Sequence, residues 1–229
     1  MRVLLSDTNW TTSTIAHDLK QAGLYVTLAH SGEDLMEHAK AGEQDFILLD
    51  MDMPDMTVFE VLRGLSFLAA APVSVMTPAG DVDARIKAFN AGADDCVEVT
   101  VDSAELVARL IAMARCYAGF SSAELSLGSL TVDVFERRAC VHGKPMHLSR
   151  LEYELVEMLV LRRSRLASRD QIMAQLYAWE DEPDARIIDV YICRIRAKIT
   201  ELGGEPEMIS ASVGRGYPFG DALPKMLAA

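Results

Sequence analysis

The stretch LLDMDMPDM at residues 48–56 decides the fold of the first half of this chain. It begins inside an apolar run, FILLD at 46–50, that ends in Asp50 and continues into a polar loop. Continuous apolar runs of this length are typical of strands buried on both faces of a parallel sheet. In such sheets, functional groups gather beyond the carboxyl ends of the strands. Asp50 is therefore a candidate site residue.

Apolar runs alternate with amphipathic stretches on both sides of this segment. We expect strands at 2–6, 24–29, 46–50, 71–77 and 96–99, and helices at 11–22, 32–41, 56–65, 81–93 and 103–119. Five such pairs predict an α/β doubly wound, five-stranded parallel sheet over residues 1–119. Asp7 and Thr77 close two other apolar runs, so we expect both at the same rim as Asp50.

Residues 120–128 are small and polar and are predicted to be a linker, and a second domain follows at 129–229. Short strands turn at 137–138 and again at 143–144. Ser149 with Glu152, and Ser168 with Gln171, fit capping boxes that begin two helices. A third helix is expected from about 185 to 202, and the tail at 208–219 reads as a hairpin. This order predicts an α+β winged helix-turn-helix domain.

Composition limits the class of protein. The 229 residues leave room for two domains, and no apolar stretch is long enough for a membrane helix. The four cysteines are far apart, which argues against a zinc site. The net charge is −12, of which residues 1–120 carry −10. The second half is nearly neutral with a concentration of basic residues, so it can present a basic face to nucleic acid.

The stretch IIDVYICRIRAKI at 187–199 predicts a helix with two different faces. Four isoleucines form one stripe, at 188, 192, 195 and 199. Arg186, Val190 and Arg194 lie opposite, flanked by Tyr191, Arg196 and Lys198. Such a face fits a DNA major groove, although an ordinary amphipathic surface helix has the same pattern. Arg215, between two glycines at the hairpin tip, fits a minor groove or a phosphate, and a solvated turn is the alternative.

Taken together, these motifs resemble the OmpR/PhoB family of winged-helix response regulators, in particular its CtrA-like alphaproteobacterial branch. The resemblance covers nearly the whole chain, and DEPDARIIDVYICRIRAKI with GRGY carries it most specifically. It implies a cytoplasmic, sequence-specific, DNA-binding transcriptional regulator of two-component type, not an enzyme. It implies base reading by Val190 and Arg194 and phosphate contacts by Tyr191 and Arg196. The loop at 177–185 matches one that can touch RNA polymerase.

The same resemblance assigns a phosphorylation site to the first domain. Asp50 matches the aspartate that accepts a phosphoryl group with Mg²⁺, and Asp7 matches an acid that helps to hold the metal. Asp52 matches the position whose backbone carbonyl completes the site. Thr77 matches the hydroxyl that turns toward the phosphoryl group.

Three positions depart from the family pattern. Thr8 replaces the acid that usually ligates the metal directly, Val99 replaces the lysine that neutralises phosphoryl charge, and Cys96 stands at an aromatic position. Asp7 and Asp50 alone would hold Mg²⁺ weakly. The sequence thus predicts a degenerate receiver that acts without phosphorylation and requires no cofactor. An ordinary phosphorylation-dependent regulator using Asp50 is the alternative, and a histidine kinase or phosphotransferase partner is left open.

Four charged residues match ion pairs that join two receivers in this family: Arg85 with Glu105, and Asp95 with Arg109. Their presence beside a depleted phosphorylation site predicts a homodimer that forms without the phosphoryl group. A solvated charged face is the alternative, because surface ion pairs are individually weak.

Two functions from other classes are alternatives. Asp50-Met51-Asp52 superficially matches the DxD motif of phosphoryl-transfer enzymes of the haloacid-dehalogenase type. That motif belongs on a first strand with a threonine two residues beyond the second Asp, where this chain has Pro54. An interaction adaptor whose winged helix no longer binds DNA is opposed by the arginines of the third helix.

Overall fold

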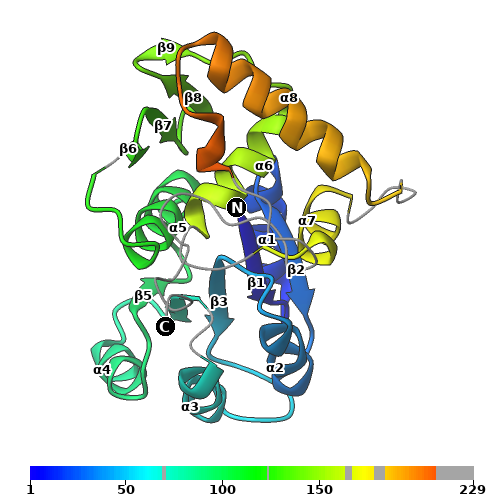
Figure 1. Cartoon of the computed structure of the whole chain (residues 1–229). Coiled ribbons are helices and arrows are strands. Elements are labelled where there is room, and N and C mark those ends of the chain that lie inside the picture. Colours follow the sequence, from blue (N-terminus) through cyan, green and yellow to red (C-terminus); the bar gives the residue numbers. More distant parts are fainter. Residues whose placement is uncertain (69–70, 123, 163–166, 178–183, 210–229) are drawn as a thin grey trace, which may run out of the picture. The chain divides into compact units, whose positions relative to one another are not determined.

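The computed structural model describes residues 1–68, 71–122, 124–162, 167–177 and 184–209. The chain divides into two compact units, Met1–Tyr117 and Ala118–Ala229, and each is treated by itself (Figure 1). In the described part of the chain, no helix is both long and apolar enough to cross a membrane.

The first unit is the doubly wound sheet that the sequence predicts. Its strands are β1 (Arg2–Ser6), β2 (Tyr25–Ala29), β3 (Phe46–Asp50), β4 (Val73–Thr77) and β5 (Asp95–Glu98). They pair in parallel in the order β2-β1-β3-β4-β5. The helices are α1 (Trp10–Gln21), α2 (Gly32–Ala41), α3 (Val58–Leu68), α4 (Val82–Asn90) and α5 (Ser103–Tyr117). The predicted fold of this half is confirmed.

The core of this unit explains why its strands read as continuous apolar runs. Every residue of β1, β3 and β4 is buried, so neither face of these strands meets water. Ile47, Leu49 and Val75 pack in one cluster with Leu35 of α2 and Leu62 of α3. The strand order changes direction at β1, which places the ends of β1 and β3 side by side where α/β sheets hold their ligands.

The loop between β3 and α3 is fixed to the start of α2 by Asp55. Its Oδ1 accepts a hydrogen bond from the Gly32 amide at 2.7 Å, and its Oδ2 accepts one from the Glu33 amide at 2.9 Å. These two bonds lower the pKa of Asp55. A Cβ atom on Gly32 would lie 2.3 Å from Cγ of Met56, so only glycine allows this close approach.

The second unit opens with a four-stranded antiparallel sheet. Its strands are β6 (Glu124–Leu127), β7 (Leu130–Asp133), β8 (Arg138–Val141) and β9 (Lys144–Pro145), in sequential order. β6 lies inside the segment predicted to be a linker, which is a difference from the sequence analysis. The reason is that Leu125, within an otherwise small and polar stretch, is fully buried and pairs with Val132.

Three helices follow the sheet, as predicted: α6 (Arg150–Leu161), α7 (Arg169–Leu176) and α8 (Ile187–Glu201), with a short 3₁₀ turn η1 (Pro206–Met208) after them. Both predicted capping boxes are present, at Ser149 with Glu152 and at Ser168 with Gln171. Gly203 ends α8 with a φ of 85°, which a residue with a side chain rarely adopts. The predicted hairpin lies almost entirely outside the described residues.

Replacing Asp55 by alanine should loosen the β3–α3 loop and the start of α2. Two backbone amides lose their acceptor, and we expect the free energy of unfolding to fall by about 1 kcal/mol, as for a lost helix cap. Because the pKa of Asp55 is lowered in the folded state, its contribution is present above the unfolded pKa and disappears as the pH falls through the folded pKa. Urea unfolding of both proteins at pH 7 and at acid pH measures this, and an unchanged difference at both values would contradict it.

Candidate functional site

Asp50 ends β3 in a buried position, with 5% of its surface exposed. Its Oδ2 accepts a hydrogen bond from the Thr8 hydroxyl at 2.7 Å and another from the side-chain amide of Asn9. Its backbone amide donates to Oγ of Ser6 at 2.5 Å. In the described part of the chain, no basic side chain forms an ion pair with Asp50. The buried carboxylate is therefore held by uncharged donors.

The start of α1 determines which way Asn9 points. Asn9 is the N-cap, and its side-chain oxygen accepts from the amides of Thr11 at 2.9 Å and Thr12 at 3.2 Å. With the oxygen used for capping, the NH₂ group of the same amide is directed to Asp50. Asn9 is not among the site residues predicted from the sequence, although an asparagine three residues before Thr12 at a strand-to-helix junction is a capping signal.

Asp7, the other predicted metal ligand, is directed to different partners. Its Oδ1 accepts from the hydroxyls of Thr12 at 3.1 Å and Ser13 at 2.6 Å. Its Oδ2 lies 3.9 Å from a ring nitrogen of His30. Asp7 thus supports the beginning of α1, while Asp50 is bonded to Thr8 and Asn9.

These residues offer Mg²⁺ fewer carboxylate ligands than the family pattern does. Mg²⁺ needs oxygen ligands in a tight octahedron, usually including one or two carboxylates. Here, the hydroxyl of Thr8 stands where the family has a direct carboxylate ligand, and it donates its proton to Asp50. Among the described residues, no group of three or more His, Cys, Asp or Glu side chains is arranged to hold a metal.

The other predicted receiver positions are also engaged or changed. Thr77 is fully buried, and its hydroxyl donates to the carbonyl of Val97 on β5 at 3.4 Å. Val99 donates its backbone amide to the Thr77 carbonyl at 3.0 Å, and its side chain carries no charge. Asp52 is exposed in the loop after β3. Burial raises the pKa of the Cys96 thiol to about 11, so this thiol is protonated at neutral pH.

The four residues predicted to join two receivers lie on α4, β5 and α5 and pair within the single chain. Arg109 contacts Glu105 at 2.8 Å and Asp95 at 3.6 Å. Arg85 pairs with Glu98 at 3.0 Å rather than with Glu105. Along α4, three apolar side chains are about half exposed beside these charges: Val82, Ile86 and Phe89.

In the second unit, α8 has the two faces that the sequence predicts. Ile188, Ile192, Ile195 and Ile199 are almost completely buried. Arg186 and Arg194 are exposed, and Val190 is 42% exposed. This surface offers two guanidinium groups and one small apolar group, which matches the chemistry of base edges and thymine methyl groups.

The three flanking side chains of α8 have partners inside the domain. Lys198 Nζ donates to Glu152 Oε2 and to the His147 carbonyl, each at 2.7 Å. Arg196 Nε donates to the carbonyl of Ile209 at 2.9 Å. The hydroxyl groups of Tyr191 and Tyr177 are 2.8 Å apart. These contacts orient α8, and DNA contacts by the same three residues stay predictions. Arg215 lies outside the described residues.

One acidic side chain on the exposed part of α8 is neutralised from α7. Arg169 donates to Asp189 at 2.7 Å and to the carbonyl of Ala185 at 3.4 Å. Arg169 is not among the site residues predicted from the sequence, because its partner is 20 residues away. The only signal for it is its place directly after the Ser168 cap. The pair reduces the repulsion that Asp189 would exert on a phosphate backbone.

Comparisons with known proteins agree with this arrangement. Residues 3–111 match the family model "Response regulator receiver domain", and residues 143–219 match "Transcriptional regulatory protein, C terminal". The chain is 32% identical over 231 residues to the cell cycle transcriptional regulator CtrA of Caulobacter vibrioides, with both chains covered completely. This chain belongs to the OmpR/PhoB family of response regulators, in its CtrA-like branch.

Further relatives support the same family. The cell cycle response regulator CtrA of Brucella anthropi is 32% identical over 219 residues, covering 95% of this chain and 94% of that one. Among solved structures, the response regulator DrrB of Thermotoga maritima, an OmpR/PhoB homologue, is 25% identical with a TM-score of 0.44, over 96% of this chain and 98% of that one. The two family models and the CtrA relatives show that the protein is a DNA-binding response regulator, and its family consists of transcriptional regulators rather than enzymes.

Replacing Lys198 by methionine should destabilise the winged-helix domain. The Glu152 carboxyl is 4% exposed and would lose its charged donor, so the free energy of unfolding should fall by about 1–3 kcal/mol. Burial acts to raise the pKa of Glu152, but its bonds to Lys198 and Ser149 outweigh burial and lower it. The stabilisation is therefore complete above the ordinary pKa of 4.5 and is lost as the pH falls through the folded value.

The matched control is Arg194→Met, an exposed arginine on the same helix. Its stability in urea should equal that of the wild type, while its affinity for operator DNA should fall by roughly 1–3 kcal/mol. Equal stability of the Lys198→Met protein would refute the positioning role of Lys198.

Proposed function

We propose that this response regulator binds specific double-stranded DNA sites as a homodimer and does so without phosphorylation of Asp50. The observation that carries the proposal is the pair of uncharged donors, Thr8 and Asn9, on the buried carboxylate of Asp50. Both side chains donate hydrogen bonds to Oδ2 of Asp50, so this carboxylate has partners without a metal ion. The ordinary phosphorylation-dependent regulator remains the alternative, since Asp50 itself is retained at the end of β3.

Phosphoryl transfer to a carboxylate depends on positive charge around the transferred group. In this receiver, Thr8 replaces the acid that ligates Mg²⁺ in the family, and Val99 replaces the lysine. Neither side chain supplies or recruits a cation. The hydroxyl of Thr77 is bonded to the Val97 carbonyl, so the group that would report a phosphoryl to the rest of the domain already has a partner. We infer that both the chemistry and its readout are weakened.

The proposed pairing surface is the face of α4, β5 and α5. It combines the half-exposed Val82, Ile86 and Phe89 of α4 with the ion pairs around Arg109. Burying the apolar groups supplies affinity, and the charged groups at the rim supply orientation. The local pairs of Arg109 would rearrange or be shared across the pair of chains.

Two paired chains would present two α8 helices to direct-repeat half-sites about one DNA turn apart. Arg186, Val190 and Arg194 are the exposed groups that would read base edges or contact phosphates. A contact of the segment 177–185 with RNA polymerase is also part of this proposal, and residues 178–183 lie outside the described part of the chain. Location in the cytoplasm follows from access to DNA.

Incubation with acetyl phosphate and Mg²⁺ should leave the intact mass of the wild-type protein unchanged. The reason is that Thr8 and Val99 provide neither metal ligand nor cation. The double replacement Thr8→Asp with Val99→Lys restores both groups, and this variant should gain one phosphoryl mass that disappears when Asp50 is also replaced by alanine. Asp50-dependent phosphorylation of the wild type would overturn the proposal in favour of the ordinary mechanism.

Replacing Ile86 by lysine should weaken the homodimer, because it buries a charge at the centre of the proposed pairing face. We expect the dissociation constant of unphosphorylated protein to rise at least about tenfold in sedimentation experiments. The matched control is Phe67→Lys, which changes an exposed apolar residue of α3 in the same unit and should leave pairing unchanged. A wild-type protein that stays monomeric on and off DNA would refute the pairing.

A further inference from the structure

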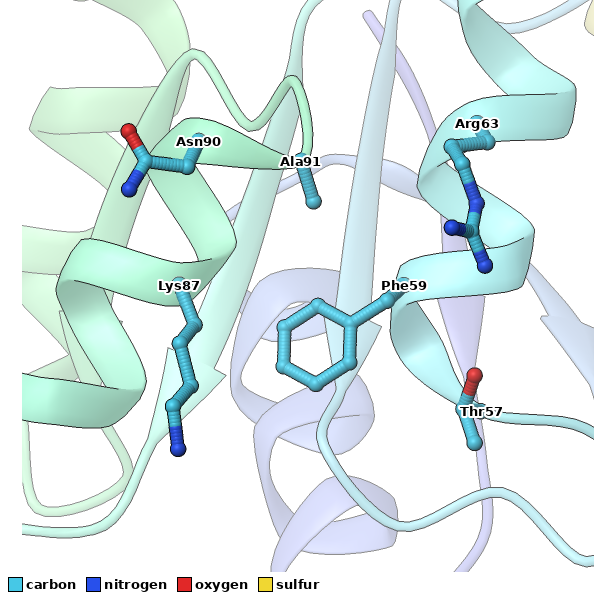
Figure 2. Close-up of a pocket in the computed structure, with 6 residues that line it drawn as sticks. All are labelled: Thr57, Phe59, Arg63, Lys87, Asn90 and Ala91. Atoms are coloured by element: carbon cyan, nitrogen blue, oxygen red, sulfur yellow. The ribbon is translucent and has the colours of Figure 1, made fainter.

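A groove of about 530 Å³ opens between α3 and α4 (Figure 2). It is lined by Thr57, Phe59, Arg63, Lys87, Asn90 and Ala91. It is separate from the end of β3, where Asp50 lies, and none of its lining residues belongs to the exposed apolar stripe of α4. A volume of this size is in the range of small-molecule sites, roughly 300–1,000 Å³.

Each of the two walls of the groove carries one cation. Arg63 extends from α3 and Lys87 from α4 (Figure 2). Within the described residues, neither has a carboxylate at ion-pair distance, whereas Arg2, Arg85 and Arg109 are all paired. Residues 1–120 carry a net charge of −10, so two cations lining one hollow form a local concentration of positive charge in an acidic domain. Such a pair attracts a small anion.

The space between the cations is bordered by an aromatic ring. Phe59 is half-buried, and Figure 2 shows its ring directed into the gap toward Lys87. Ala91 on the facing wall is small, which leaves room for a flat group against the ring. Thr57 and Asn90 add a hydroxyl and an amide for hydrogen bonds at the edge. Aromatic rings stack on flat partners in offset or edge-to-face geometry.

The nearest acid on α3 is already occupied. Glu60 accepts from the backbone amide and the hydroxyl of Thr57, each at 2.8 Å, and is not among the lining residues. The Glu60 carboxylate is thus held at the beginning of α3, where it interacts electrostatically with Arg63. Lys87, on the other wall, is the more independent cation.

We propose that this groove binds a small aromatic phosphate of mononucleotide size, with the planar base against Phe59 and the phosphate between Arg63 and Lys87. The chemistry follows from the lining: one ring, two cations and two hydrogen-bonding edges in a hollow of this volume. The site is independent of the proposed mode of DNA binding. On α4, Lys87 projects from a different side than Phe89 and Val82, whereas Asn90 is one turn after Ile86 and borders the pairing surface.

The test titrates the full chain with AMP, GMP, CMP and UMP while amide chemical shifts are followed by NMR. At least one nucleotide should give saturable shifts concentrated at Phe59, Lys87 and Asn90. Lys87→Gln and Arg63→Gln should each weaken that binding about tenfold. Lys40→Gln, an exposed lysine at the end of α2 that is remote from the groove, is the matched control and should bind like the wild type.

Two further probes separate the parts of the ligand. Inorganic phosphate and the free nucleoside should each bind more weakly than the nucleotide, since each keeps only half of the contacts. The absence of saturable shifts with all four nucleotides would overturn the proposal. Binding that maps elsewhere, or that survives both glutamine variants unchanged, would overturn it equally.

Discussion

The structure of the receiver depends on hydrogen bonds to the buried carboxylate of Asp50, which forms no ion pair with the described basic side chains. A buried charge without partners is costly, so Asp50 must be hydrogen-bonded. Thr8 and Asn9 do this from the turn between β1 and α1. Asn9 also caps α1, and Thr12 of the same cap donates to Asp7. The residues at the positions of the family's metal site thus take part in the local structure that joins β1 to α1.

A similar division of roles organises α8. Its isoleucines fix the helix to the domain, and its exposed arginines are left for DNA. The basic residues between these faces have acquired internal partners: Lys198 at Glu152 and Arg196 at the Ile209 carbonyl. Positive charge on a recognition helix therefore has two uses. We propose that the exposed guanidinium groups of Arg186 and Arg194 contact DNA, whereas the bonds of Arg196 and Lys198 hold the helix in the domain.

Much of this could be predicted from the sequence, because the relevant signals are local. Apolar runs gave the strands, the 3.6-residue periodicity gave the isoleucine face of α8, and Ser149 with Glu152 gave a cap that the structure confirms. The contacts that could not be predicted join residues that are far apart in the sequence. Lys198 meets Glu152 across 46 positions, and the amide of Asn9 meets Asp50 across 41. The sequence does not predict β6, because a four-residue edge strand among small polar residues has almost no periodic signal.

The structure also bears on how a signal could enter such a regulator. In the family, the threonine and the aromatic position couple a phosphoryl group to the pairing face. Here the Thr77 hydroxyl is bonded to Val97, and position 96 holds a half-buried thiol whose raised pKa keeps it protonated. Under the proposed phosphorylation-independent mechanism, a coupling without its cation and its aromatic group would transmit little, because a ligand shifts an equilibrium only by its differential affinity for the two states. The α4 helix has two adjoining surfaces, one half-exposed and apolar and one that lines the cationic groove. Input to this receiver is therefore expected at the surface of α4 rather than at Asp50.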